Sequence, residues 1–280
     1  MKIPTSRIFW VCSVLLTAAL SLPTLAGDGD ASANKAALQA AINGDTRSEE
    51  NKARDVYRHP LETLTFFGIE PHMTVVEISP GGGWYTEILA PFLNEKGTYI
   101  AAGYDPESES ENVRKAAERF DEKLAGNPNY SNAKTRVFAL PDKVEIAPAG
   151  SADMVLTFRS IHGFMRGGNA EVAFKAFFDA LKPGGVLGLV QHRGTGEEPQ
   201  DPKASKGYVN EAYILALAEK AGFKLAAKSE VNANPKDTKD YEGGVWTLPP
   251  RLSKGDDGKD TYLAIGESDR MTLKFVKPAN

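Results

Sequence analysis

The chain has little cysteine and little histidine, and this scarcity excludes several kinds of chemistry. Its 280 residues contain one cysteine and four histidines, and the cysteine, Cys12, lies in an apolar run near the N-terminus. One cysteine cannot build a disulfide framework or a thiolate metal site. No two histidines have the spacing of metal ligands, so no metal is expected.

A long hydrophobic run typical of a membrane-spanning helix is also missing. The apolar run from Ile8 to Leu22 is closed by a proline, whereas a spanning helix needs about 20 residues. Lys2 and Arg7 precede this run, and the small residues of Thr24-Leu25-Ala26 follow it, as in a cleavable secretory signal. We therefore expect residues 1–26 to be removed, together with the only cysteine, and the protein to be periplasmic or otherwise exported. The alternative is an uncleaved membrane anchor.

Basic residues form no block along the chain. Two of the 33 basic residues and none of the 37 acidic ones lie in the expected signal, so the rest carries 31 against 37. This acidic excess argues against a nucleic-acid partner and leaves a small molecule as the expected one. The remaining 254 residues suit one large domain, which we place at residues 60–280 after N-terminal helices over 27–59. The oligomeric state is left open.

The segment before residue 68 predicts helices. Residues 28–34 are expected to be a mobile lead-in, followed by a helix over 35–42. A second helix is expected to start at Thr46, because Glu49 three residues later completes a capping box. A third, over 60–67, has proline in its first turn and stops at a glycine.

From residue 74 on, short apolar runs alternate with amphipathic stretches. The expected strands are 74–78, 98–104, 134–140, 152–158 and 186–191, and the expected helices are 84–93, 107–124, 171–181 and 208–221. This alternation predicts an α/β fold with a mainly parallel sheet and helices on both faces. Two further strands, 223–231 and 271–276, have no helix between them and predict an antiparallel hairpin at the edge.

A glycine-rich turn follows the first expected strand, in Ser79-Pro80-Gly81-Gly82-Gly83. Open α/β sheets bind ligands at such a turn, because small residues let the backbone approach the ligand and the next helix offers free N–H groups. Asp105 ends the second strand, where a carboxylate can accept hydrogen bonds from ribose hydroxyls. The alternatives are a simple tight turn and, for Asp105, a helix cap. A dinucleotide-dependent oxidoreductase is disfavoured, because Thr86 holds the third glycine position of that fingerprint.

These motifs together resemble the class I S-adenosylmethionine-dependent methyltransferases. Glu77, Ser79, Gly81 and Gly83 align with the family's acidic-x-Gly-x-Gly-x-Gly motif, and Asp105 with its second-strand acid. The residue pattern from Glu77 to Thr86, together with Tyr57-Arg58-His59-Pro60 upstream, resembles that of a group of exported bacterial predicted methyltransferases. The resemblance implies a Rossmann-like, doubly wound, seven-stranded sheet and S-adenosylmethionine as cofactor. The family's first glycine is replaced by Ser79 and followed by a proline, which predicts a stiffer loop.

The resemblance and the expected carboxyl edge of the sheet give a set of candidate site residues. The expected catalytic residues are His162 and His192, each of which follows a strand; a structural role for either remains the alternative. The expected cofactor-binding residues are Glu77, Ser79, Gly81, Gly82, Gly83 and Asp105. The expected substrate-binding residues are His59, Arg159, Arg193 and Trp246; the alternative for His59, which the following proline favours, is that it only starts a helix.

Trp246 lies in a polar connection over residues 232–270, whose composition favours disorder at both ends. We expect Trp246 to fold back over the cleft as a lid; the alternative is packing on the sheet edge away from the site. The function expected is methyl transfer to a small molecule or an exposed side chain. The alternative is an exported, non-catalytic ligand-binding protein that keeps the methyltransferase fold.

Overall fold

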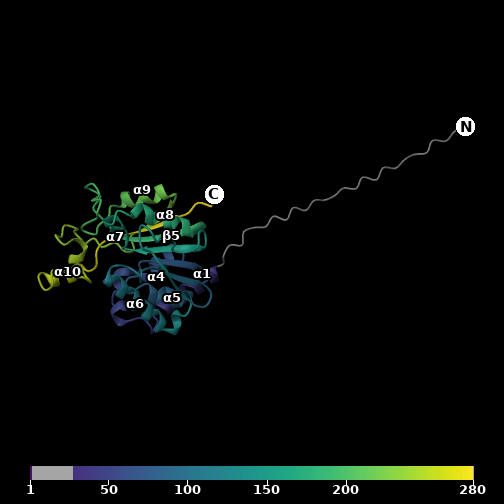
Figure 1. The fold of residues 1–280 in the computed structure, drawn as a ribbon, viewed down its shortest axis with the longest axis horizontal. Helices are drawn as coiled ribbons and strands as arrows, with labels where there is room; N and C mark the ends of the chain where they lie inside the picture. The colour runs from purple at the N-terminus through teal and green to yellow at the C-terminus, as the bar shows by residue number, and fades with distance from the viewer. Residues whose placement is uncertain (2–27, 280) are drawn as a thin grey trace.

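The computed structural model describes Met1 and residues 28–279, which form a sheet with helices on both faces (Figure 1). The sheet has seven strands in the order β3-β2-β1-β4-β5-β7-β6. The strands are β1 (Thr74–Ile78), β2 (Thr98–Gly103), β3 (Ala133–Val137), β4 (Ala152–Phe158), β5 (Leu181–His192), β6 (Lys224–Ser229) and β7 (Arg270–Val276). The expected signal peptide lies outside the described residues.

The first five strands are parallel, and β7 alone runs against its neighbours β5 and β6. The expected mainly parallel, doubly wound sheet with a C-terminal antiparallel pair is therefore confirmed. The central strands β1 and β4 are buried along almost their whole length, which explains their mainly apolar sequences. The edge strand β3 has Lys134, Thr135 and Arg136 exposed, as expected of a strand with one solvent side.

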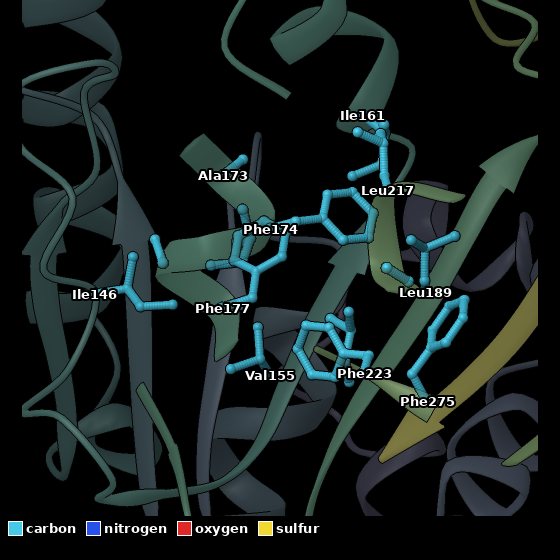
Figure 2. Packing of buried hydrophobic residues seen from close by; sticks show 14 of the residues in the cluster. Ile146, Val155, Ile161, Ala173, Phe174, Phe177, Leu189, Leu217, Phe223 and Phe275 are labelled. Carbon is cyan, nitrogen blue, oxygen red and sulfur yellow. The ribbon is translucent and has the colours of Figure 1, made fainter. Parts of the chain in front are cut away.

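Helices cover each face of the sheet and enclose a separate apolar core. One face is covered by α1 (Asp28–Ile42), α4 (Pro60–Phe67), α5 (Thr86–Leu93) and α6 (Glu111–Ala125). The other is covered by α7 (Ile161–Arg166), α8 (Ala170–Ala180) and α9 (Glu211–Ala221). Figure 2 shows the second core, where Phe174 and Phe177 of α8 belong to the same cluster as Val155 of β4 and Leu189 of β5. Burying each of these rings contributes about 2–3 kcal/mol, so both layers are fixed to the sheet.

The N-terminal expectations need three corrections. The lead-in is helical, since α1 begins at Asp28. The second helix is α2 (Glu49–Lys52), and Ser48 rather than Thr46 caps it by accepting a hydrogen bond from the Asn51 N–H at 3.2 Å. Helix α2 begins later than the expected Thr46 because the chain first turns to bury Arg47, whose guanidinium donates hydrogen bonds to the Ile42 carbonyl and to the Asp55 carboxylate. A further short helix, α3 (Asp55–Arg58), precedes α4.

The polar connection between β6 and β7 is ordered, so the expectation of disorder at its ends is wrong. Buried Asn232 donates hydrogen bonds to Thr63 and Thr272, at 3.0 and 2.9 Å. Buried Asp237 accepts from the Tyr208 hydroxyl at 2.9 Å and from the Asp269 N–H at 2.8 Å. Composition alone predicted solvation, whereas specific hydrogen bonds hold these polar side chains. The middle contains the 3-10 turn η2 (Gly244–Thr247) and the helix α10 (Lys259–Ile265).

None of the helices that the structure describes is long and apolar enough to cross a bilayer. Residues 28–279 also contain no cluster of three or more side chains arranged to hold a metal ion.

Candidate functional site

The glycine-rich turn leaves β1 at the carboxyl edge of the sheet with a left-handed backbone. Ser79 has φ 51°, Gly81 φ 62° and Gly83 φ 82°. A serine in this region costs about 1 kcal/mol that a glycine would not. The Ser79 N–H donates to the Ala102 carbonyl at 2.7 Å, so the β1–β2 ladder holds this strained residue in place.

The backbone of the turn is open toward the solvent side. A Cβ atom placed on Gly81 or Gly82 would meet no other atom within 4 Å. On the other side, the Pro80 ring lies against Gly103, where an added Cβ would come within 3.0 Å of Pro80 Cδ. The expected stiffness therefore has a structural basis, since the ring is packed against the end of β2. The N–H groups of Gly81 and Gly82 remain accessible to a ligand, whereas the Gly82 carbonyl accepts a hydrogen bond from Lys123 Nζ at 3.2 Å.

Glu77 is buried beneath the turn in a small hydrogen-bonded cluster. Its carboxylate accepts from the Tyr99 hydroxyl at 2.6 Å and from the Thr86 hydroxyl at 3.1 Å. Burial raises the pKa of Glu77 to about 7, although both hydroxyl donors act in the opposite direction. Thr86, which breaks the dinucleotide fingerprint, therefore serves to satisfy a buried acid.

Asp105 lies just beyond β2, at the same edge. It accepts from the Glu107 N–H at 3.0 Å and pairs with Lys143 at 2.8 Å, and the Lys143 hydrogen bond lowers the pKa of the Asp105 carboxyl. The helix-cap alternative does not apply, because α6 begins only at Glu111, after Ser110. Lys143 is substantially exposed, and an exposed ion pair contributes so little that a ligand hydroxyl can compete for the carboxylate.

A cleft of about 340 Å³ opens beside the glycine-rich turn. Its walls come from the turn itself, from the segment around α2 and α3, and from the residues after β4 and β5. The lining residues are Asn51, Arg54, Arg58, Glu77, Ser79–Gly82, Trp84, Tyr85, Phe158, Arg159, Ser160 and His192. The structure thus brings together four of the six predicted cofactor residues, Glu77, Ser79, Gly81 and Gly82, whereas Gly83 and Asp105 do not line this cleft.

Stacked aromatic rings form one wall of the cleft. Tyr85 lies flat on Phe158, with ring centroids 3.5 Å apart and an interplanar angle of 9°. Trp84 packs edge-on against Tyr85 and donates from Nε1 to the Asn51 carbonyl at 2.9 Å. The Arg58 guanidinium lies 4.6 Å from the centre of the Trp84 ring. The wall is therefore rigid, apolar and able to face a cation or a flat ligand.

Arginines form a second wall, which adjoins the aromatic one at Arg58 and surrounds one buried acid. Glu267 accepts from Arg54 at 2.7 Å and from Arg58 at 3.4 Å, and it pairs with Arg270 as well. Coulombic attraction from Arg270 and Arg58 overcomes burial and lowers the pKa of Glu267 to about 2. Arg159 completes the wall, and burial with the nearby Arg270 lowers its pKa to about 10. This side of the cleft is strongly positive in a protein of net negative charge.

The two predicted catalytic histidines lie together, but only His192 lines the cleft. Their ring centroids are 5.5 Å apart. His192 Nδ1 lies 2.5 Å from the Ser268 hydroxyl, and His162 Nδ1 lies 3.3 Å from Gln191 Nε2. Burial lowers the pKa of His162 to about 4 and that of His192 well below its usual value, so both rings are neutral at pH 7. A neutral ring can accept a proton, and their catalytic roles stay predictions.

The remaining predicted substrate residues differ in their placement. His59 joins α3 to α4 with φ 41° and does not line the cleft, as expected of a residue that only starts a helix. Arg193 is turned toward Glu230 and Asp269 and lies off the cleft. Trp246 packs edge-on against His162 at 5.8 Å, so it stands behind the histidine pair rather than on the cleft surface.

Sequence reasoning missed most of the arginine wall and the aromatic wall. Arg58 stands beside His59, yet no local pattern favoured the arginine over the histidine. Arg54, Glu267 and Arg270 come from segments more than 200 positions apart, which no local pattern connects. Phe158 had one available signal, because it ends the fourth strand at the predicted ligand edge.

A larger hollow of about 810 Å³ lies elsewhere, between α8, α9 and residues 144–149. These elements meet near the amino ends of β4 and β5, whereas ligands of parallel sheets bind at the carboxyl ends. Its charged residues, among them Glu171, Lys175 and Lys220, pair with neighbours on the surface. The smaller cleft is therefore the candidate site.

The sequence matches no protein-family model and no curated protein. The structure is similar to an S-adenosylmethionine-dependent methyltransferase from Aquifex aeolicus, with a TM-score of 0.50 and 17% identity, covering 80% of this chain and 93% of that one. It is also similar to a candidate sarcosine dimethylglycine methyltransferase from Galdieria sulphuraria, with a TM-score of 0.51 and 14% identity, covering 85% and 90%. A third similar structure, from Haloferax volcanii, is a methyltransferase in complex with the Trm112 activator, with a TM-score of 0.50 and 15% identity, covering 86% and 97%.

The chain has the methyltransferase fold. At these identities the likeness defines the fold, and any activity has to be argued from the site. The residues present fit S-adenosylmethionine: the N–H groups of Gly81 and Gly82 are open, an aromatic wall faces the cleft, and the only side chain paired with Asp105 among the described residues is an exposed lysine.

Proposed function

We propose that the protein is an S-adenosylmethionine-dependent methyltransferase that acts on a small molecule or an exposed side chain. The observation that carries this proposal is the open, left-handed turn of Ser79, Gly81 and Gly83, which stands at the carboxyl end of β1 beside an acid that follows β2. In a methyltransferase fold this is the place where a nucleoside ligand is held. The resemblance to exported bacterial methyltransferases and the expected signal peptide further favour a periplasmic or otherwise exported location.

The residues of the chain would bind the cofactor and orient it toward the methyl acceptor. Gly81 and Gly82 would present backbone N–H groups, and Asp105 would accept hydrogen bonds from the ribose hydroxyls in place of Lys143. When bound, S-adenosylmethionine supplies a methyl group on a good leaving group, so positioning the acceptor and excluding water provide most of the rate. Tyr85 and Phe158 would exclude water from this side of the cleft.

His192 would accept a proton where the acceptor carries one. It lines the cleft, and burial keeps its ring neutral at pH 7. In the tautomer in which Nδ1–H donates to the Ser268 hydroxyl, the Nε2 lone pair is free to act as a base. His162 would act as a positioning residue behind His192.

A second candidate function is an exported binding protein that keeps the fold without transferring methyl groups. Two observations favour it: Lys143 already pairs with Asp105, and the Pro80 ring is packed against Gly103. The adenosine side of the site is therefore more restricted than the arginine side.

Isothermal titration calorimetry of the chain with S-adenosylhomocysteine tests the proposal. We expect saturable binding, followed by methyl transfer from S-adenosylmethionine to a suitable acceptor. Binding without turnover on any acceptor would support the second function. Failure to bind either compound at millimolar concentration would reject the cofactor assignment and with it the methyltransferase.

A further inference from the structure

The arginine side of the cleft carries more positive charge than its own acids can balance. Glu267 is shared by Arg54, Arg58 and Arg270. Glu77, the other acid of the cleft, is held by two hydroxyl groups, and burial raises its pKa to about 7. Four guanidinium groups thus stand against one fully ionised carboxylate and one partly protonated one. Partly buried cations without counter-charges are costly unless a ligand supplies the charge.

Arg159 is the clearest case of an unbalanced cation. Among the described residues, its guanidinium forms no ion pair with a carboxylate, and the residue is half-buried; Glu267 is the acid that acts on it, through space. Its backbone is held in the left-handed region at φ 60° by the hydrogen bond from its N–H to the Val190 carbonyl, at 2.7 Å. A strained, non-glycine residue that presents an unpaired charge to a cleft is typical of a ligand-binding position.

We propose that this wall binds an oxyanion of the methyl acceptor, so that the substrate is an acidic small molecule bearing a carboxylate or a phosphate. Arg159 and Arg58 would hold the anion, since planar guanidinium groups bind such oxygens in pairs of parallel hydrogen bonds. The acceptor role rests on the proposed function, whereas anion binding does not. His192 lines the same cleft, so the anchored substrate would lie beside the residue assigned to proton removal.

The carboxylate of the cofactor is the other possible source of an anion for the arginine wall. The net charge of the cofactor argues against it as the group that this wall binds. S-adenosylmethionine carries a sulfonium and an ammonium group besides its carboxylate, so its net charge is positive. Its binding would add positive charge to a cleft that already has an excess. An anionic acceptor reduces that excess. Its affinity should therefore be higher when the positively charged cofactor is present.

Calorimetric titrations of the full chain with inorganic phosphate and with succinate at low ionic strength test the anion site. We expect wild type to bind at least one of them and Arg159→Gln to weaken that binding by roughly tenfold or more, as for the loss of a charged hydrogen bond. Arg159→Lys should retain part of the affinity, and Arg119→Gln, on the exposed face of α6, should bind like wild type. Equal affinity of Arg159→Gln and wild type, or no binding of either anion by wild type, would overturn the proposal.

Two nucleosides separate the possible sources of the anion. S-adenosylhomocysteine has the amino-acid carboxylate, and 5′-methylthioadenosine lacks it. We expect Arg159→Gln to bind both as wild type does. Selective loss of S-adenosylhomocysteine binding would show that Arg159 holds the cofactor and would overturn the acceptor assignment. If wild type binds phosphate through Arg159 but neither nucleoside, the anion site stands and the methyltransferase proposal fails.

Discussion

The buried acid beneath the glycine-rich turn should make the stability of the fold depend on pH. Burial raises the pKa of Glu77 from 4.5 to about 7 in the folded chain. The folded state therefore holds this proton more tightly than the unfolded state does. The stabilisation is fully present below pH 4.5 and is lost as the pH rises to 7. Between pH 5 and pH 8 the loss is on the order of 2–3 kcal/mol.

Glu77→Gln removes this titration while leaving an amide oxygen that can accept from the Tyr99 hydroxyl. Its free energy of unfolding relative to wild type should therefore rise by on the order of 2–3 kcal/mol between pH 5 and pH 8. Urea unfolding followed by circular dichroism at both pH values measures this change, and taking the difference from wild type cancels all other titrating groups. Glu118→Gln, on the exposed face of α6, is the matched control and should show no such change. The same difference from wild type at both pH values would refute the reasoning.

Three further predictions concern the site and the N-terminus. Asp105→Ala should weaken S-adenosylhomocysteine binding roughly a hundredfold by removing two charge-assisted hydrogen bonds, and calorimetry showing unchanged affinity would remove Asp105 from the site. Trp246→Ala should hydrate His162 and raise its pKa from about 4 toward 6.5, as followed by NMR titration; an unchanged value would show that Trp246 does not shield the histidine. Mass spectrometry of the protein from an envelope fraction should find an N-terminus at or near Gly27, and intact protein starting at Met1 in the cytosol would contradict export.

Sequence patterns predicted the sheet well because its signals are local. The strands over 74–78 and 152–158 and the helix over 60–67 have the predicted boundaries, since an apolar run or a proline and a glycine delimit each. The helix expected from Tyr208 starts only at Glu211, because the Val209 N–H instead donates to the His192 carbonyl. The short helix α7 was missed because its six residues are too few to show a helical period.

The half of the site around the glycine-rich turn was predictable from the sequence, and the arginine wall was not. The glycine-rich turn and Asp105 follow adjacent strands, so the order of the elements was enough to bring them to one edge. The arginine wall depends on Glu267, a residue of the polar connection, which meets Arg58 from 209 positions away. Only the closed fold decides which charged residues of that connection are buried, and composition favours the opposite outcome. The predicted lid role of Trp246 stays a prediction.

The position of β7 between β5 and β6 sets the order in which the working protein can form during synthesis. Until the last strand emerges from the ribosome, the long edge of β5 has no partner, and β6 has no neighbour at all. Glu267 and Arg270 arrive with that strand, so the arginines near α3 lack their shared counter-ion until this part of the chain has been made. A chain that lacks β7 would thus combine a bare strand edge with uncompensated buried charge, and both features mark it for aggregation or proteolysis. Synthesis of β7 acts as a checkpoint, because the site and the paired edge of β5 appear in the same step.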